Sequence, residues 1–194
     1  MALALEARAM KDDIMLGDTP KALKRRRRVK DVKTRGRLWK HSTLADIDGL
    51  VTSDELSGLF CFTLVRNPWD RAVSYYHWLR GQGFDHPSVH LAKAVSFEGF
   101  LRDKSTQGAL QGWPASRYMR DVNGAERCSA YIRLEYFAED AAPLTAHLGF
   151  ELKLPMVNQS ERQSGYQSYY TAETQKIIAE CCAEDISRFG YSFT

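Results

Sequence analysis

The residues best suited to chemistry lie together near the middle of the chain. Arg66 and Asn67 follow a short apolar run, Leu59–Val65, and Pro68 comes directly after them. An arginine guanidinium offers a planar set of donors that suits phosphate or sulfate. Asn67 is a good N-cap and Pro68 favours the first helical position, so a helix with its positive dipole end should begin beside the arginine. These residue types predict an anion-binding site.

Two further polar residues follow at helical spacing. Arg71 and Ser74 lie four and seven residues after Asn67, which places all three on one face of the expected helix. The Ser74 hydroxyl could add a contact to an anion that Arg66 binds. The alternative is a capped helix with a surface arginine and a serine that bonds to its own backbone. The spacing alone leaves both alternatives open.

The elements around these residues alternate between strands and helices, which predicts an α/β fold with a parallel sheet. Leu59–Val65 predicts a buried strand, and weaker patterns predict two more strands at Gly36–His41 and Arg127–Leu134. Because the carboxyl ends of parallel strands share one sheet edge, His41 is expected beside Arg66. The imidazole there could act as a general base, or it could only cap or pack.

Helix-forming patterns account for much of the remaining chain. We expect helices over residues 2–10, 68–80, 89–101 with an interruption near Ser96, 135–148 with an interruption at Pro143, and after Thr171 as far as Gly190. Polar composition predicts surface loops over Gly81–Pro87 and Ser105–Pro114, which could border a substrate.

Composition indicates an ordinary domain of 194 residues, with a net charge of only +3, which gives no indication of nucleic-acid binding. Lys21–Lys33 nevertheless concentrates basic residues. That run could be a solvated surface, a docking site for an anionic ligand or acceptor, or a nucleic-acid patch. The four cysteines have no metal-finger spacing, which favours a reducing, cytoplasmic compartment and no metal site. No apolar run has transmembrane length, and no pattern indicates an oligomeric state.

The stretch Val65–Tyr76 resembles the Arg-Asn-Pro-x-x-Arg-x-x-Ser-x-Tyr signature of sulfotransferases, in particular the carbohydrate sulfotransferases and their bacterial relatives. The resemblance implies that Arg66 and Ser74 bind the 3′-phosphate of 3′-phosphoadenosine-5′-phosphosulfate (PAPS), with Asn67 and Arg71 beside them. It also implies a three-layer P-loop-like fold, in which helices flank a small central parallel sheet.

Three weaker similarities occur in the order that the family shows. Lys40–Thr43 resembles the segment that places a histidine at the end of the second strand, Val157–Arg162 resembles an Asn-x-Ser loop, and Asp185–Tyr191 resembles an Asp-x-x-x-Phe-Gly-Tyr ending. The loop is expected to close over the nucleotide or the acceptor, or to be a polar surface loop, and its candidate residues are Asn158, Ser160 and Arg162.

The sequence lacks the family's first strand and the Gly-rich loop after it, which binds the 5′-phosphosulfate. Thr19–Ala22 contains a Pro-Lys pair but no glycine. We expect residues 1–10 to be the helix that follows this loop, so that residues 1–194 form one N-terminally truncated domain whose first strand is missing.

The resemblance therefore implies a PAPS-dependent sulfotransferase that acts on an acceptor hydroxyl, such as one of a saccharide, without a metal and without nucleic acid. The alternative is an inactive relative that binds a 3′-phosphonucleotide or a polyanion without turnover. A P-loop kinase is disfavoured because no Gly-x-x-x-x-Gly-Lys-Ser/Thr motif occurs.

Overall fold

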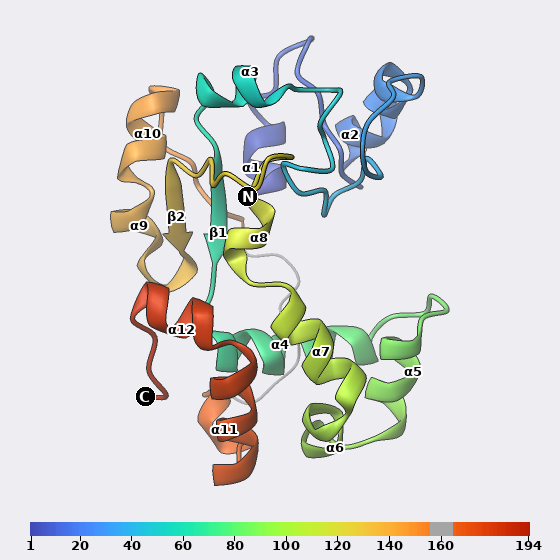
Figure 1. The fold of residues 1–194 in the computed structure, drawn as a ribbon, viewed down its shortest axis with the longest axis vertical. Helices are drawn as coiled ribbons and strands as arrows, with labels where there is room; N and C mark the ends of the chain where they lie inside the picture. Colours follow the sequence, from blue (N-terminus) through green and yellow to red (C-terminus); the bar gives the residue numbers. More distant parts are fainter. Residues whose placement is uncertain (156–164) are drawn as a thin grey trace. The chain divides into compact units, whose positions relative to one another are not determined.

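The computed structural model describes residues 1–155 and 165–194, and these residues are 51% helical with one small parallel sheet (Figure 1). Contacts divide the chain into two compact units. Unit 1 comprises Met1–Leu64, Ser116–Ile132 and Tyr136–Val157, and unit 2 comprises Val65–Ala115, Arg133–Glu135 and Asn158–Thr194.

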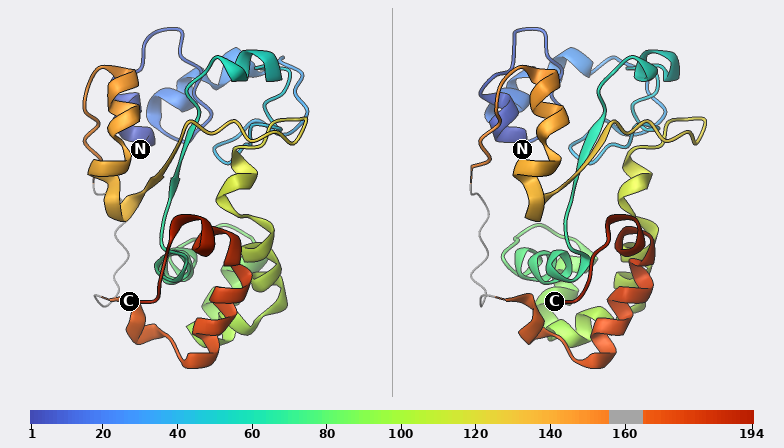
Figure 2. Two further views of the ribbon diagram at one scale, coloured as in Figure 1. Left: turned by 60° about the vertical axis from the view of Figure 1, so that its left-hand side comes forward. Right: turned by 90° about the vertical axis from the view of Figure 1, so that its left-hand side faces the viewer.

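The sheet lies mainly in unit 1 and pairs β1 (Phe62–Val65) with β2 (Ala130–Arg133). Helices α9 (Phe137–Asp140) and α10 (Ala142–Leu148) follow β2 and lie beside it (Figure 2). Ile132 of β2 is fully buried in a cluster to which both of these helices contribute apolar side chains. Burial of these side chains is the main force that attaches the helices to the sheet.

A second cluster of unit 1 lies around the buried residues Leu56, Cys61 and Met119. Leu56 belongs to α3 (Ser53–Ser57), which begins with a complete capping box between Thr52 and Glu55. The cluster therefore connects α3 to the chain that enters β1, because Cys61 directly precedes that strand.

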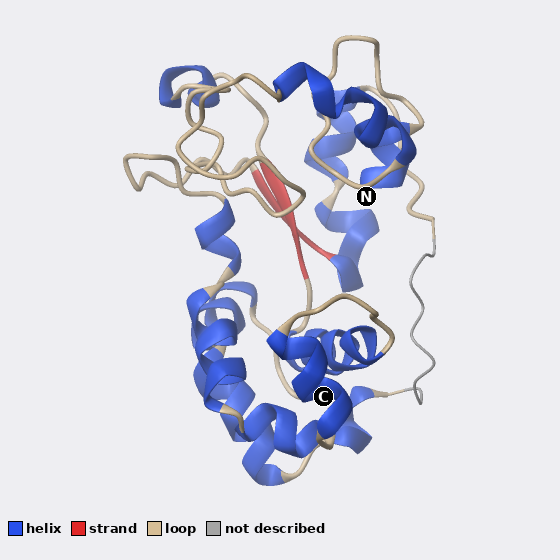
Figure 3. Ribbon diagram, turned by 90° about the vertical axis from the view of Figure 1, so that its right-hand side faces the viewer, coloured by secondary structure: helices blue, strands red, loops and turns tan. Residues whose placement is uncertain are grey.

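The N-terminal part of unit 1 is made of short helices joined by loops (Figure 3). It contains α1 (Ala2–Glu6), α2 (Pro20–Arg25) and the 3-10 helix η1 (Arg26–Val29). The expected helix over residues 2–10 ends early, at Glu6. The ammonium group of Lys21 donates to the Glu6 carbonyl at 2.7 Å, which stabilises this early end.

Unit 2 is helical, and its core surrounds α4 (Pro68–Arg80). One face of α4 is buried through Trp69, Val73, Tyr76 and Leu79. The helices that share the unit with it are α5 (Pro87–Ala94), α6 (Phe97–Arg102), α7 (Lys104–Gly112), α11 (Ala172–Cys181) and α12 (Ala183–Phe189), together with the 3-10 helix η3 (Tyr166–Tyr169).

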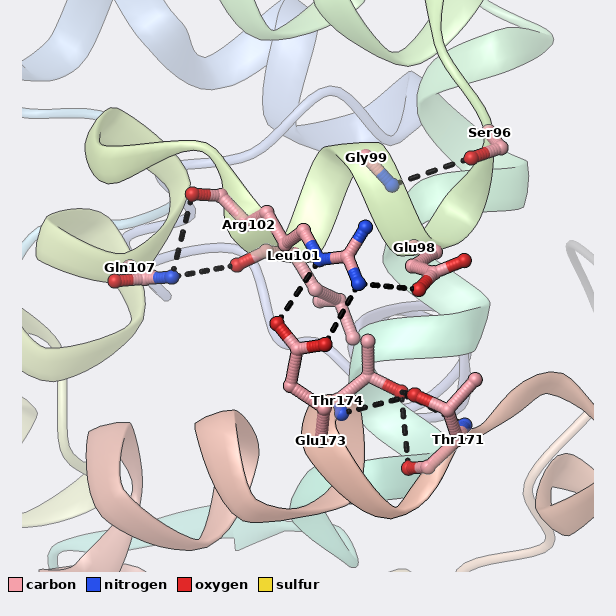
Figure 4. A network of polar contacts seen from close by, with 9 residues as sticks. All are labelled: Ser96, Glu98, Gly99, Leu101, Arg102, Gln107, Thr171, Glu173 and Thr174. Carbon is pink, nitrogen blue, oxygen red and sulfur yellow. Dashed lines mark hydrogen bonds and ion pairs between the residues drawn. The ribbon is translucent and has the colours of Figure 1, made fainter.

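Polar contacts connect α6 to α11 within unit 2 (Figure 4). The Arg102 guanidinium donates to both carboxylate oxygens of Glu173, at 3.0 and 2.6 Å, and lies 2.7 Å from a carboxylate oxygen of Glu98. Thr171 caps α11 by accepting the N–H of Thr174. The predicted cap at Thr171 is thus confirmed.

Other sequence-based boundaries are also confirmed. Ser96 separates α5 from α6, and its hydroxyl accepts the N–H of Gly99. Pro143 lies in the first turn of α10, where its missing N–H costs nothing. Gly149 and Gly190 end α10 and α12 in the left-handed conformation, with φ of 73° and 66°.

The predicted strand Gly36–His41 is wrong, because this segment is an irregular loop with bends that ends in a turn at Lys40 and His41. The Arg35 N–H donates to the Asp48 carbonyl and the Gly36 N–H donates to the Asp46 carbonyl, both at 2.9 Å. Tertiary contact also decides the conformation, since a Cβ at residue 36 would collide with the Asp46 side chain. The described residues therefore form a sheet of two strands where the sequence predicts three.

The predicted loop Ser105–Pro114 is also wrong, because most of it forms α7. Asp103 caps this helix by accepting the N–H groups of Ser105 and Thr106 at 2.9 and 3.1 Å. Thr106 is buried, so packing overrides the polar and glycine-rich composition. A second difference is a break at Cys182, which divides the expected last helix into α11 and α12.

Candidate functional site

The connection between β1 and α4 consists of two residues, Arg66 and Asn67. The Asn67 side-chain oxygen accepts the N–H groups of Trp69 and Asp70, at 3.0 and 3.4 Å. The predicted N-cap is therefore confirmed. The side-chain nitrogen of Asn67 donates to the Tyr166 hydroxyl at 3.3 Å, so this cap residue also contacts η3.

The first backbone N–H groups at this junction are occupied within the protein. Asn67 N–H donates to a carboxylate oxygen of Glu135 at 2.7 Å, and Arg71 N–H donates to the Asn67 carbonyl at 2.8 Å. Pro68 has no N–H, and the Asn67 side chain caps the next two amides. An anion bound at the start of α4 would depend mainly on side chains and on the helix dipole, because the amides of Asn67, Trp69, Asp70 and Arg71 already have acceptors.

Arg66 is held in place by an ion pair one helical turn away. Its Nε donates to Asp70 Oδ2 at 2.6 Å, and its Nη2 contacts the same oxygen. The two side chains are 27% and 19% exposed. Among the described residues, Arg66 Nη1 has no hydrogen-bond partner. The guanidinium therefore keeps one edge for a ligand while Asp70 fixes the other.

Ser74 lies on α4 two turns after Asn67 and is half-buried. Its hydroxyl has no hydrogen-bond partner within the described part of the chain. A bond from this serine to its own backbone, one of the alternatives that the spacing allows, is not present. Ser74 is therefore able to donate to a ligand on this face of α4.

Arg71 shares the face of α4 with Asn67 and Ser74, but its guanidinium binds within the protein. Nη1 donates to Asp185 Oδ2 at 3.2 Å and Nη2 contacts the Cys182 sulfur at 3.6 Å. Asp185 is 4% exposed, and its other oxygen accepts the Ala115 N–H at 2.9 Å. This network gives Arg71 a structural contact with α12, although its side chain is 32% exposed.

His41 belongs to unit 1 and lies in a turn at an exposed position. Its ring meets the Trp39 ring edge to face, with centroids 4.7 Å apart. Partial desolvation lowers the pKa of His41 below its usual value, the charge of Lys40 lowers it further, and Asp18 opposes both effects. A lowered pKa keeps the imidazole neutral at neutral pH, the form in which it can accept a proton.

Glu135 is a site residue that the sequence reasoning did not select. One carboxylate oxygen accepts the Asn67 N–H, and the other accepts the Tyr191 hydroxyl at 3.1 Å. It follows β2, so its position at the carboxyl end of a parallel strand is a signal that could have identified it. Glu135 connects the start of α4 to the C-terminal segment.

Three candidates lie outside the described residues: Asn158, Ser160 and Arg162. Their assignment to a loop over the nucleotide or acceptor remains a prediction.

Several side chains of the basic run Lys21–Lys33 contact neighbouring parts of unit 1. Arg25 donates to the Asp13 carbonyl at 3.2 Å, and Arg26 pairs with Asp18 at the same distance. These contacts account for part of the basic run as local structure. Lys24, Arg27, Lys30 and Lys33 are exposed, and docking of an anionic ligand to them remains a prediction.

Comparisons of this chain with protein-family models, with curated proteins and with solved structures find no match. Within residues 1–155 and 165–194, no helix is long and apolar enough to cross a membrane.

Proposed function

We propose that this chain is a PAPS-dependent sulfotransferase that transfers a sulfuryl group to an acceptor hydroxyl. The observation that carries the proposal is the junction between β1 and α4, where the sequence signature and the local geometry coincide. Arg66 offers one unpartnered guanidinium nitrogen and Ser74 offers an unpartnered hydroxyl among the described residues. Both donors suit the 3′-phosphate of the nucleotide.

The fit to PAPS is good at one end of the nucleotide. Arg66 and Ser74 would bind the 3′-phosphate, and Asn67 would maintain the start of α4 that positions them. The sequence contains no Gly-rich loop for the 5′-phosphosulfate, so the proposal assigns that end to no residue of this chain. The same proposal includes a P-loop-like fold for this chain.

Sulfuryl transfer needs position and charge stabilisation more than covalent chemistry from the protein. The acceptor oxygen forms a bond to sulfur as the bond from sulfur to the 5′-phosphate oxygen breaks, and 3′-phosphoadenosine-5′-phosphate leaves. The acceptor proton passes to a base. His41 stays the sequence-based candidate for this role, and its lowered pKa favours the neutral imidazole. Arg66 and Ser74 orient the nucleotide throughout.

The proposal is tested by thermal-shift titration of the full chain with 3′-phosphoadenosine-5′-phosphate and with 5′-AMP. We expect stabilisation by the first ligand alone, because Arg66 and Ser74 recognise the 3′-phosphate. Arg66→Ala should abolish the response, whereas Arg80→Ala, at the far end of the same helix, should retain it. An equal response to both nucleotides, or none, would exclude the site.

Transfer of labelled sulfate from PAPS then separates an enzyme from a relative that only binds. Turnover that is lost in His41→Gln while nucleotide binding persists supports the base role. Nucleotide binding without turnover, with any of a set of saccharide and phenolic acceptors, would leave binding as the activity and contradict sulfuryl transfer by this chain.

A further inference from the structure

Positive charge is concentrated in one part of unit 1, residues 10–15 and 20–30, which we call the basic surface. It contains eight lysines and arginines and only two aspartates. The net charge of the whole chain is +3, so the residues outside the basic surface are negative on balance. Such an uneven distribution favours an anionic partner at this surface.

The two segments of the basic surface lie side by side. Arg25, at the end of α2, donates to the Asp13 carbonyl at 3.2 Å, and Arg28 of η1 donates to the Lys11 carbonyl. Ala22 of α2 is buried, so this helix has an inner side against the rest of unit 1. The segments therefore form one surface, and two of its arginines are used to hold it together.

Three other cations of the basic surface have no partner on the protein. Lys24, Arg27 and Lys30 are exposed, and their side chains form no hydrogen bond or ion pair with any described residue. Lys24 and Arg27 are three residues apart, on consecutive turns of α2 and η1. Like charges at this spacing repel one another, and an anionic surface placed against them relieves the repulsion.

The basic surface also exposes large aliphatic side chains. Met10 is 73% exposed, Ile14 is 52% exposed and Leu23 is 51% exposed, and a lysine directly follows both Met10 and Leu23. Single-stranded nucleic acids are bound by cations and aromatic rings, which leaves these aliphatic groups without a role. Protein interfaces are depleted in lysine. The surface of an anionic bilayer accommodates both kinds of side chain, because headgroup phosphates attract the cations and the boundary with the acyl chains takes up apolar groups.

We propose that the basic surface docks onto an anionic lipid bilayer. Lys24, Arg27 and Lys30 contact lipid phosphates, and Leu23 enters the boundary between headgroups and acyl chains. Each cation contributes modestly, so several act together, and salt weakens the attachment by screening them. The proposal does not rest on the proposed function, because the basic surface and the nucleotide site share no residue.

The test is cosedimentation of the full chain with vesicles of phosphatidylcholine alone and with vesicles of equal parts phosphatidylcholine and phosphatidylglycerol. We expect binding to the mixed vesicles only, and loss of that binding at high salt. Lys24→Gln and Arg27→Gln should each weaken it by about fivefold, the effect of one cation near an anionic bilayer. Lys176→Gln is the charge-matched control, since Lys176 is exposed on α11, outside the basic surface, and should leave binding unchanged.

A second pair of variants tests the apolar contribution. Leu23→Gln should weaken vesicle binding by about tenfold, because the leucine side chain no longer leaves water on docking. Leu59→Gln is the matched control: Leu59 is 53% exposed, belongs to the same unit and lies outside the basic surface, so binding should persist. Melting temperatures of both variants, measured by circular dichroism, identify any loss of folding.

Several outcomes would overturn the proposal. These are no binding to the mixed vesicles at low salt, equal binding to vesicles of phosphatidylcholine alone, or the same response to Leu23→Gln as to Leu59→Gln, which would show adsorption by charge alone. Heparin and a single-stranded oligonucleotide are titrated in parallel. Tight binding of either one without vesicle binding would make the basic surface a polyanion site and refute the lipid partner.

The result is separable from the proposed function. Arg66→Ala should bind the mixed vesicles as the natural chain does, and Lys24→Gln should respond to 3′-phosphoadenosine-5′-phosphate as the natural chain does. Loss of vesicle binding in Arg66→Ala would contradict the proposal, because it would place lipid binding at the nucleotide site.

Discussion

At the scale of residues, the two arginines of the signature have different environments. Arg66 precedes α4, pairs with Asp70 of that helix and keeps Nη1 without a partner among the described residues, whereas Arg71 binds the buried Asp185. The sequence does not show which of the two has a partner in the core, because Asp185 lies far along the chain from both. Only the position of α12 determines that Arg71 has a partner in the core.

Arg71→Ala should destabilise the protein by about 2–4 kcal/mol, because it leaves the Asp185 carboxylate buried without its cation. Urea unfolding measures this as a lower transition midpoint. Lys176→Ala is the control, since its contact with Glu180 is long, at 3.7 Å, and both side chains are mostly exposed. A change at Arg71 as small as that at Lys176 would contradict the structural role.

At the scale of elements, short turns and caps determine most of the boundaries. One example is the turn in unit 1 that follows Arg120, which forms an isolated bridge with Glu126. The Asp121 carboxylate organises this turn. It accepts the N–H groups of Asn123 and Ala125 at 2.9 Å and Arg127 Nε at 2.8 Å, although it is only 2% exposed.

The hydrogen bond from Arg127, with those from the backbone, holds the pKa of Asp121 below its usual value. A group whose pKa is lowered by folding stabilises the protein above its unfolded-state pKa, which is about 3.9 for aspartate. That stability should be lost as the pH falls below about 4 and through the folded-state pKa. Melting temperatures measured across this range should therefore fall more steeply for the natural chain than for Asp121→Asn.

The control for this experiment is Asp12→Asn, which changes an exposed carboxylate of the same unit. The melting temperature of this variant should fall with pH as steeply as that of the natural chain. If the melting temperature of Asp121→Asn also fell as steeply as that of the natural chain, the Asp121 turn would contribute nothing to the loss of stability in acid.

At the scale of the whole molecule, the distribution of thiols is informative. All four cysteines are free, and Cys61 and Cys182 are buried. Desolvation raises the pKa of every one of these thiols above its usual value, and it is the largest cause at each of them. A raised pKa reduces the thiolate fraction, which is the reactive form.

The folded chain should therefore react slowly with a thiol reagent such as Ellman's reagent at neutral pH. Unfolding in guanidinium should release four rapidly reacting thiols, because it removes the burial that raises their pKa. Rapid reaction of two or more thiols in the folded chain, or fewer than four after unfolding, would contradict this distribution.

The sequence by itself determined the features that depend on neighbours along the chain. These include the strand that leads into α4, the cap at Asn67, the interruption at Ser96 and the left-handed ends at Gly149 and Gly190. Each follows from local sterics or from hydrogen bonds within a few residues, so its residue type is sufficient evidence.

Only the tertiary structure decided the features that depend on distant partners. Gly36 lies in a bend against Asp46, α7 forms because Thr106 is buried, and Arg71 binds Asp185 far along the chain. Glu135 likewise reaches Asn67 through folding, since β2 carries it to the end of β1. Such contacts involve residues far apart in sequence, and local propensity carries no information about them.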